Sequence, residues 1–100
     1  MQTRITARHF NLNDDLRNHI EARISKLHQV YDGITDASTI LSVEKGHPED
    51  HEAEIILNVY RQQLSARDMA SSHEEAIDRC AQRLRRQLLR YKAKLRGRRK

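Results

Sequence analysis

Residues 72–96 have the pattern of one long amphipathic helix, and a helix of that length limits the folds open to a chain of 100 residues. Its start is marked by Ser72, followed three residues later by Glu75, which is the spacing of a capping box. The apolar residues that then recur at helical spacing are Ile77, Cys80, Ala81, Leu84, Leu88, Tyr91 and Leu95. Run to Arg96, this helix would be about 36 Å long at ~1.5 Å per residue. Its single apolar face predicts that it lies on a sheet.

A second amphipathic helix is expected from Asn13 to Tyr31. Asn13 is a good N-cap residue, and Asp14 and Asp15 lie in the first turn, where the helix dipole favours negative charge. The apolar stripe of this helix consists of Leu16, Ile20, Ile24, Leu27 and Tyr31. Gly33 is expected to end it as a C-terminal glycine.

Four other segments favour β-strands. Residues 2–10 alternate in character, and residues 37–45 and 51–61 are rich in β-branched and aliphatic side chains. Gly and Pro in residues 46–50 predict a turn between these two strands. Residues 63–70 are expected to form a fourth strand, although the short turn before them lacks the usual Asn-Gly pair. The inward-facing residues of the third strand should be Ala53, Ile55, Leu57 and Val59.

The predicted order of elements is β-α-β-β-β-α, an α+β fold with a four-stranded sheet. Because a strand-helix-strand connection is almost always right-handed, the first two strands are expected to be parallel neighbours. The other strands should join antiparallel as hairpins, with both helices on one face of the sheet. Residues 1–96 then form a single domain, and residues 97–100 form a short basic tail.

The positive charge of the chain is concentrated near its C-terminal end. Residues 79–100 hold eleven of the nineteen Lys and Arg residues and no Asp or Glu. Residues 1–70 carry eight basic and eleven acidic side chains, whereas residues 71–100 carry eleven basic and three acidic ones. A basic patch on a near-neutral body is typical of proteins that bind nucleic acid or an anionic membrane.

The basic residues of the last helix fall on both flanks of its apolar face. At about 100° per residue, one flank carries a continuous row of Arg79, Arg83, Arg86, Arg90 and Lys94. The opposite flank carries Arg85, Lys92 and Arg96. Arg23 and Lys26 of the first helix should lie nearby, because both helices share a face of the sheet. From Arg79 onward no acidic residue of the helix compensates these charges, so the ten residues are predicted to bind a polyanion.

Two other interpretations of the basic helix are disfavoured. A merely solvated face usually mixes acidic with basic side chains, and this one does not. A membrane-surface helix would need its apolar face for lipid, but that face lacks Trp and Phe and is required by the sheet. No apolar run approaches the length of a membrane span.

Other functional sites are weakly indicated. His47 and His51 have a spacing seen in metal sites, but they lie around a predicted turn without a nearby Cys, so we expect no metal. Cys80, the single cysteine, lies on an apolar stripe and is expected to be a buried hydrophobe in a cytoplasmic protein. No catalytic constellation or Gly-rich phosphate loop is recognisable, so we expect no enzyme, no cofactor and no small-molecule substrate. Phe10 and Tyr60 receive no assignment.

Several short segments carry a family resemblance that covers about residues 2–96. In the first helix they are Leu16-Arg17, Ile20, Arg23-Ile24 and Lys26-Leu27; after the second strand, Val43-Glu44-Lys45; and in the last helix, Ala76-Ile77-Asp78, Arg86-Gln87-Leu88 and Lys92-Ala93-Lys94-Leu95. In their order and spacing they resemble the bacterial ribosome hibernation promoting factor family, which includes the ribosome-associated translation inhibitor A. The chain resembles the short hibernation-promoting form most.

The resemblance implies the same fold, similar to a double-stranded RNA-binding domain. It also implies binding to the small ribosomal subunit, in the channel where mRNA and tRNAs would otherwise lie. The ten basic residues would then contact rRNA phosphates and block translation by occupancy. The short form would assist a separate modulation factor in pairing ribosomes into inactive dimers during stationary phase or stress.

The chain departs from the family pattern at the start of the last helix. Relatives tend to have Asp-Met-Tyr before Ala-Ile-Asp, whereas Ser72 to Glu75 precede it here, so an aromatic contact to RNA at that point is not expected. An alternative function from the residues themselves is a general double-stranded RNA-binding or RNA-chaperone module.

Overall fold

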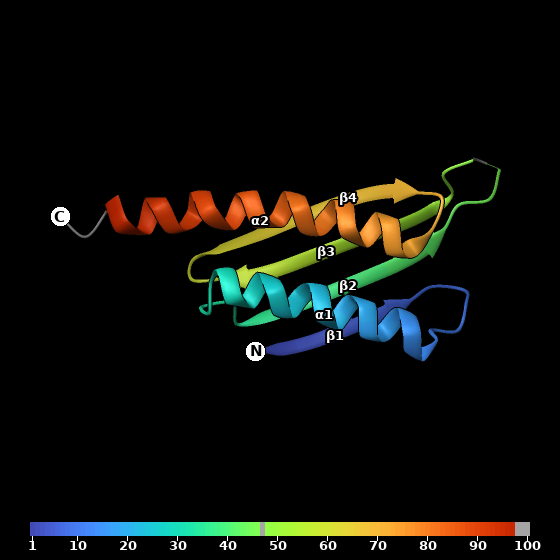
Figure 1. The fold of residues 1–100 in the computed structure, drawn as a ribbon, viewed down its shortest axis with the longest axis horizontal. Helices are drawn as coiled ribbons and strands as arrows, with labels where there is room; N and C mark the ends of the chain where they lie inside the picture. Colours follow the sequence, from blue (N-terminus) through green and yellow to red (C-terminus); the bar gives the residue numbers. More distant parts are fainter. Residues whose placement is uncertain (47, 98–100) are drawn as a thin grey trace.

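The computed structural model describes residues 1–46 and 48–97, and its elements follow the predicted order (Figure 1). They are β1 (Gln2–Ala7), α1 (Asp14–Val30), β2 (Asp36–Val43), β3 (His51–Val59), β4 (Gln62–Ala70) and α2 (His73–Gly97). The α+β prediction is therefore confirmed, including the fourth strand. Gly97, which was predicted to begin the basic tail, is the last residue of α2, and His47 and residues 98–100 lie outside the described residues.

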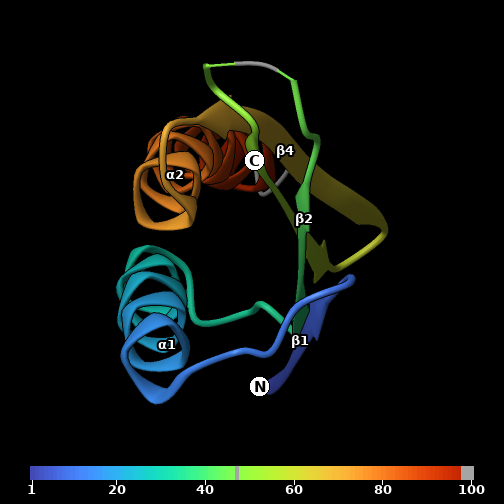
Figure 2. The ribbon, with the colours of Figure 1, turned by 90° about the vertical axis from the view of Figure 1, so that its right-hand side faces the viewer.

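The four strands form one mixed sheet in the order β1-β2-β3-β4. β1 pairs parallel with β2, from Gln2 opposite Asp36 to Ala7 opposite Leu41, as expected for two strands joined through a helix. The pairs β2–β3 and β3–β4 are antiparallel. Seen end on, the helices and the sheet form two layers, with both helices on one face (Figure 2). The helices run in the same direction, and α2 extends beyond the β3–β4 turn (Figure 1).

The core lies between these two layers and is aliphatic. The predicted inward face of β3 is confirmed, because Ala53, Ile55, Leu57 and Val59 are all buried. The predicted apolar stripe of α2 is buried at Ile77, Cys80, Leu84, Leu88 and Tyr91. Each fully buried Leu or Ile contributes about 1.5–3 kcal/mol relative to exposure, so these residues help to hold α2 on the sheet.

Both helices begin where the sequence predicts. The Asn13 Oδ1 atom accepts a hydrogen bond from the backbone N–H of Leu16 at 2.8 Å. The Ser72 Oγ atom accepts one from the N–H of Glu75 at 3.2 Å. Only this half of the capping box forms, because the Glu75 carboxylate accepts hydrogen bonds from Ser71 and Arg79 instead.

The end of α1 differs from the prediction. The helix stops at Val30, and its cap is Tyr31 in an extended conformation, with φ −149°. Gly33 does not have the positive φ of a C-terminal glycine. A Cβ at Gly33 would instead lie 2.4 Å from the Tyr31 side chain, so any larger residue would require that ring to move. The space beside Gly33 is therefore taken by the end of the Tyr31 ring, and no positive φ calls for a glycine there.

The first strand is shorter than predicted. It ends at Ala7, because the chain turns at His9, whose φ of 68° is incompatible with a strand. This turn brings the Phe10 ring onto the ring of His73 at the start of α2, with 4.8 Å between centroids. Neither described helix contains a stretch apolar enough to cross a lipid bilayer.

Candidate nucleic-acid interface

Side chains of α2 cover the outer edge of β4, the last strand of the sheet. Three of them donate hydrogen bonds to backbone carbonyls of that strand: Arg79 to Met69 at 2.7 Å, Arg83 to Arg67 at 3.2 Å and Gln87 to Ser65 at 2.9 Å. Four residues of helix advance about 6 Å and two residues of strand about 6.8 Å, so the two ladders stay in step. An edge strand with unpaired carbonyls can recruit another strand, and α2 occupies these groups.

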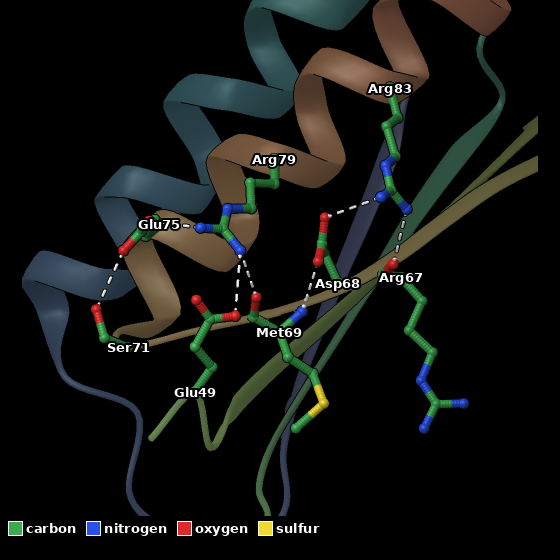
Figure 3. A network of polar contacts seen from close by, with 8 residues as sticks. All are labelled: Glu49, Arg67, Asp68, Met69, Ser71, Glu75, Arg79 and Arg83. Carbon is green, nitrogen blue, oxygen red and sulfur yellow. Dashed lines mark hydrogen bonds and ion pairs between the residues drawn. The ribbon is translucent and has the colours of Figure 1, made fainter. Parts of the chain in front are cut away.

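The first two arginines of the row are also paired with carboxylates (Figure 3). Arg79 lies 2.9 Å from Glu75 and 3.5 Å from Glu49, and Arg83 lies 3.3 Å from Asp68. Desolvation would lower the pKa of Arg79, but the neighbouring carboxylates outweigh it and raise that pKa. The expectation that no acid compensates the row is therefore wrong for Arg79 and Arg83, because Glu75 lies one turn earlier in the same helix and Glu49 and Asp68 come from outside it.

Beyond Arg83 the cations of the row have no partners among the described residues. Arg86, Arg90 and Lys94 are exposed, and none of them makes an ion pair or a side-chain hydrogen bond with any described residue. No Asp or Glu follows Asp78 in the chain, so the helix itself supplies no counter-charge. Three cations on successive turns with no partner in the described fold form the part of α2 best suited to bind an external polyanion.

Arg23, predicted to face the polyanion from α1, is held by Asp78 of α2. Its Nε atom lies 2.7 Å from Asp78 Oδ1, and His19 Nε2 lies 2.8 Å from the same oxygen. Partial burial would raise the pKa of Asp78, but the hydrogen bonds from Arg23 and His19 lower it below its ordinary value. This group ties the two helices together and partly neutralises Arg23.

Lys26 and Arg85 line a surface hollow of about 300 Å³ between α1 and α2, beside Arg23. Both are exposed and have no ion pair among the described residues. The structure thus brings together basic residues of both helices, which the sequence analysis expected from their shared face of the sheet.

Lys92 and Arg96 complete the opposite flank. The Lys92 Nζ atom donates to the backbone carbonyl of Val30 at 2.9 Å, at the C-terminus of α1. The last carbonyls of a helix have no intrahelical partner, and a cation there is favoured by the helix dipole. Lys92 therefore has a structural contact, whereas Arg96 is exposed and unpaired within the described part of the chain.

The β3–β4 turn contributes two residues that the sequence analysis did not assign to the site. Tyr60 is 63% exposed, and the Arg61 guanidinium carbon lies 5.3 Å from the centroid of its ring. Lys94 lines the same surface hollow as both of them. The only signal in the sequence was that this turn lacks Asn-Gly.

Of the remaining candidates, His51 and Cys80 are among the described residues, whereas His47 lies outside them. His51 Nδ1 lies 2.7 Å from Asp50 Oδ1 but is not aligned for a hydrogen bond, and its ring packs edge-on against His73. Among the described residues no group of three His, Cys, Asp or Glu could hold a metal ion. Burial raises the pKa of the Cys80 thiol to about 11, and its Sγ atom donates to the carbonyl of Ala53 at 3.4 Å. Cys80 is therefore a buried core residue, as predicted.

Known proteins resemble this chain along nearly its whole length. Residues 3–96 match the family model described as "Sigma 54 modulation protein / S30EA ribosomal protein". The ribosome hibernation promoting factor of Azotobacter vinelandii is 33% identical over 94 residues, covering 94% of this chain and 85% of that protein. The ribosome hibernation promoting factor of Escherichia coli K12 is 32% identical over 95 residues, covering 95% of this chain and 97% of that protein.

Solved structures have the same fold. The Thermus thermophilus Protein Y N-terminal domain superposes with a TM-score of 0.80 at 24% identity, over 91% of this chain and 99% of that one. A ribosomal subunit interface protein from Coxiella burnetii gives a TM-score of 0.80 at 20% identity, over 93% of this chain and 99% of that one. With the fold shared and the family model matched from residue 3 to residue 96, the chain belongs to the non-enzymatic S30EA family of ribosome hibernation promoting factors.

Proposed function

We propose that this protein binds the small ribosomal subunit through rRNA phosphates in the channel that mRNA and tRNAs otherwise occupy. Bound there, it blocks translation by occupancy and leaves the ribosome chemically unchanged. Together with a separate ribosome modulation factor, it promotes the pairing of inactive ribosomes in stationary phase or stress. Its place of action is then the cytoplasm.

The observation that best supports this function is the set of unpaired cations on the second half of α2. Arg86, Arg90 and Lys94 repel one another on one flank, and rRNA phosphates would remove that repulsion. Lys26, Arg85 and Arg96 offer a second line of charge toward α1.

Four of the predicted contact residues already have partners within the fold: Arg23, Arg79, Arg83 and Lys92. A guanidinium has five N–H donors, so the three arginines retain donors for phosphate. We assign these four a secondary part in binding, because contact with RNA would compete with bonds that hold the helices and β4 together.

Charge reversal tests this assignment. The double variant Arg86→Glu, Arg90→Glu should lose about a hundredfold or more in affinity for small subunits, because two attractions to phosphate become repulsions. Arg4→Glu with Arg8→Glu is the matched control, since it changes the net charge equally at exposed positions on and just after β1. Co-sedimentation with purified small subunits measures the affinity, and thermal unfolding checks that both variants fold. Equal affinities of the two double variants would contradict the proposed surface.

The mechanism of inhibition requires a second measurement. If the protein acts by occupancy, it should compete with mRNA and initiator tRNA for the small subunit and need no nucleotide. In vitro translation should then recover fully after a high-salt wash removes the protein. Lasting inactivation, or cleaved rRNA on a sequencing gel, would show chemistry instead.

A general double-stranded RNA-binding or RNA-chaperone role predicts a different competition result. Duplex RNA in modest excess would then displace the protein from small subunits. Retention on the subunit in the presence of that duplex is the result expected from the ribosomal function.

A further inference from the structure

The turn between β3 and β4 contains a residue that its geometry disfavours. Val59 pairs with Gln62, so Tyr60 and Arg61 alone make the turn. Arg61 has φ 60°, in the left-handed region that glycine and asparagine adopt far more readily than a residue with a long side chain. An arginine at such a position is conformationally costly, and side chains kept at a strained turn often serve binding.

Tyr60 is exposed while its backbone is firmly held. Its side chain contributes little to the core, because the residue is 63% exposed. Its carbonyl nevertheless accepts a hydrogen bond from the Tyr91 hydroxyl of α2 at 2.7 Å. The turn is therefore hydrogen-bonded to α2, and the exposed Tyr60 side chain extends from that anchored backbone.

The surroundings of this ring are cationic. Tyr60 and Arg61 line a surface hollow of about 490 Å³ together with Lys94 of α2, and none of the residues lining it is acidic. A neighbouring hollow of about 270 Å³ is lined by Lys94 again, together with Arg90 and Gln62. Lys94, the last unpaired cation of the row, thus lies beside the exposed ring of Tyr60.

An aromatic face beside cations fits one ligand chemistry particularly well. Single-stranded RNA presents flat bases that stack on tyrosine and phosphates that pair with Arg and Lys. A base in a duplex is already stacked on both sides, so only an unpaired nucleotide can use the Tyr60 ring. A strand whose phosphates follow Arg86, Arg90 and Lys94 would bring its next base to this turn.

We propose that the β3–β4 turn is a binding site for an unpaired RNA nucleotide, with its base stacked on the face of the Tyr60 ring away from the Arg61 guanidinium and its flanking phosphates held by Arg61 and Lys94. The site deepens the RNA binding proposed above, on which it rests, by naming the class of nucleotide bound. It gives the protein a preference for single-stranded RNA that charge alone does not provide.

The test compares labelled RNAs of equal length by fluorescence anisotropy. The probes are single-stranded oligoadenylate, the matching abasic ribose-phosphate oligomer and a duplex. The protein should bind oligoadenylate about 5- to 150-fold more tightly than the abasic oligomer, which is the usual range for one base stacked on an aromatic ring. Tyr60→Ala should remove this difference and leave affinity for the abasic oligomer unchanged. Tyr60→Phe should retain it, because the ring remains.

Two further variants separate binding from folding. Arg61→Gly relieves the left-handed strain, so it should raise the Tm while it weakens binding of both single-stranded probes. Tyr60→Asn places a good turn-forming residue there and should lose base preference without a loss of Tm. In the unmodified protein, the ring proton signals of Tyr60, assigned by their loss in Tyr60→Phe, should move upfield on addition of oligoadenylate and not of the abasic oligomer.

Each result can be assigned to one of the two proposals. Equal affinity of the protein for oligoadenylate and the abasic oligomer would overturn the Tyr60 site, as would a base preference that survives in Tyr60→Ala. Ribosome binding that depends on Arg86 and Arg90 would stand in either case. Conversely, a base preference lost in Tyr60→Ala supports the site even if the Arg86, Arg90 charge reversal leaves ribosome binding intact.

Discussion

The two halves of α2 carry the same kind of residue at the same spacing and use it differently. In the first half, Arg79 and Arg83 donate to the edge carbonyls of β4 and lie within 3.5 Å of carboxylates. In the second half, Arg86, Arg90 and Lys94 have no such partners among the described residues. The difference follows from where the carboxylates lie, because Glu75, Glu49 and Asp68 all reach the first half of the helix. Farther along, β4 still reaches Gln87 through the Ser65 carbonyl but presents no acid there, and the last turns of α2 extend beyond the β3–β4 turn (Figure 1).

A row of like charges on one helix is therefore not a functional unit by itself. The tertiary fold decides which of its members meet acidic groups and which remain available to a ligand. Arg79 and Arg83 donate to edge carbonyls of β4 and pair with acids, whereas Arg86 and Arg90 have no ion pair among the described residues. The predictions below test whether the division between a structural half and a binding half is real.

The largest expected effect concerns packing. Leu84→Ala in the structural half should lower the free energy of unfolding by about 2–5 kcal/mol, because Leu84 is fully buried against the sheet. Leu95→Ala should cost only about 1 kcal/mol, since Leu95 is partly exposed near the overhanging end and water can fill the space left. Denaturant unfolding measures both. Equal losses would mean that the end of the helix is held as firmly as its middle.

Two double variants each remove two positive charges, one pair from each half of α2. Arg86→Gln with Arg90→Gln should reduce the slope of log affinity for ribosomes against log salt by about 1.4–1.8, from about 0.7–0.9 per phosphate contact, and leave the Tm unchanged. Arg79→Gln with Arg83→Gln should barely change that slope but lower the Tm by a few degrees, because β4 loses two edge donors and three carboxylates lose their partners. The opposite pattern would reverse the assignment of the two halves.

The smallest effect concerns the Asp78 contact between the helices. The pKa of Asp78 is lowered in the folded state, because the hydrogen bonds from Arg23 and His19 outweigh the effect of burial. The ionised carboxylate therefore stabilises the fold at pH values above its unfolded pKa of about 3.9. That stabilisation is lost as the pH falls through the folded pKa. Asp78→Asn should therefore lower the Tm by one or two degrees at pH 7 and by less at pH 3. A Tm difference that grows in acid would contradict this linkage. The effect is small because the Asp78 side chain is 39% exposed.

Local patterns predicted most of the fold. Helix starts at Asn13 and Ser72 depend on hydrogen bonds within three residues, and the inward faces of β3 and α2 depend on periodicity, so both could be derived from the chain alone. The errors lie where side-chain packing decides the local conformation. The strand ends before Phe10, whose ring packs on His73 of α2. The ring of Tyr31 occupies the space beside Gly33, which does not act as a C-terminal glycine.

The sequence predicted which basic residues lie on the surface of α2, but not which of them pair with other groups of the fold. Sequence alone determined that the cations of α2 lie on its flanks and that no acid follows them in the helix, because helical geometry is local. Packing of the sheet against the helices brings Glu49 to Arg79, Asp68 to Arg83, Lys92 to the end of α1 and Tyr60 beside Lys94. These partners are separated by many residues along the chain and approach only when the sheet and helices pack together, so no spacing in the sequence records them.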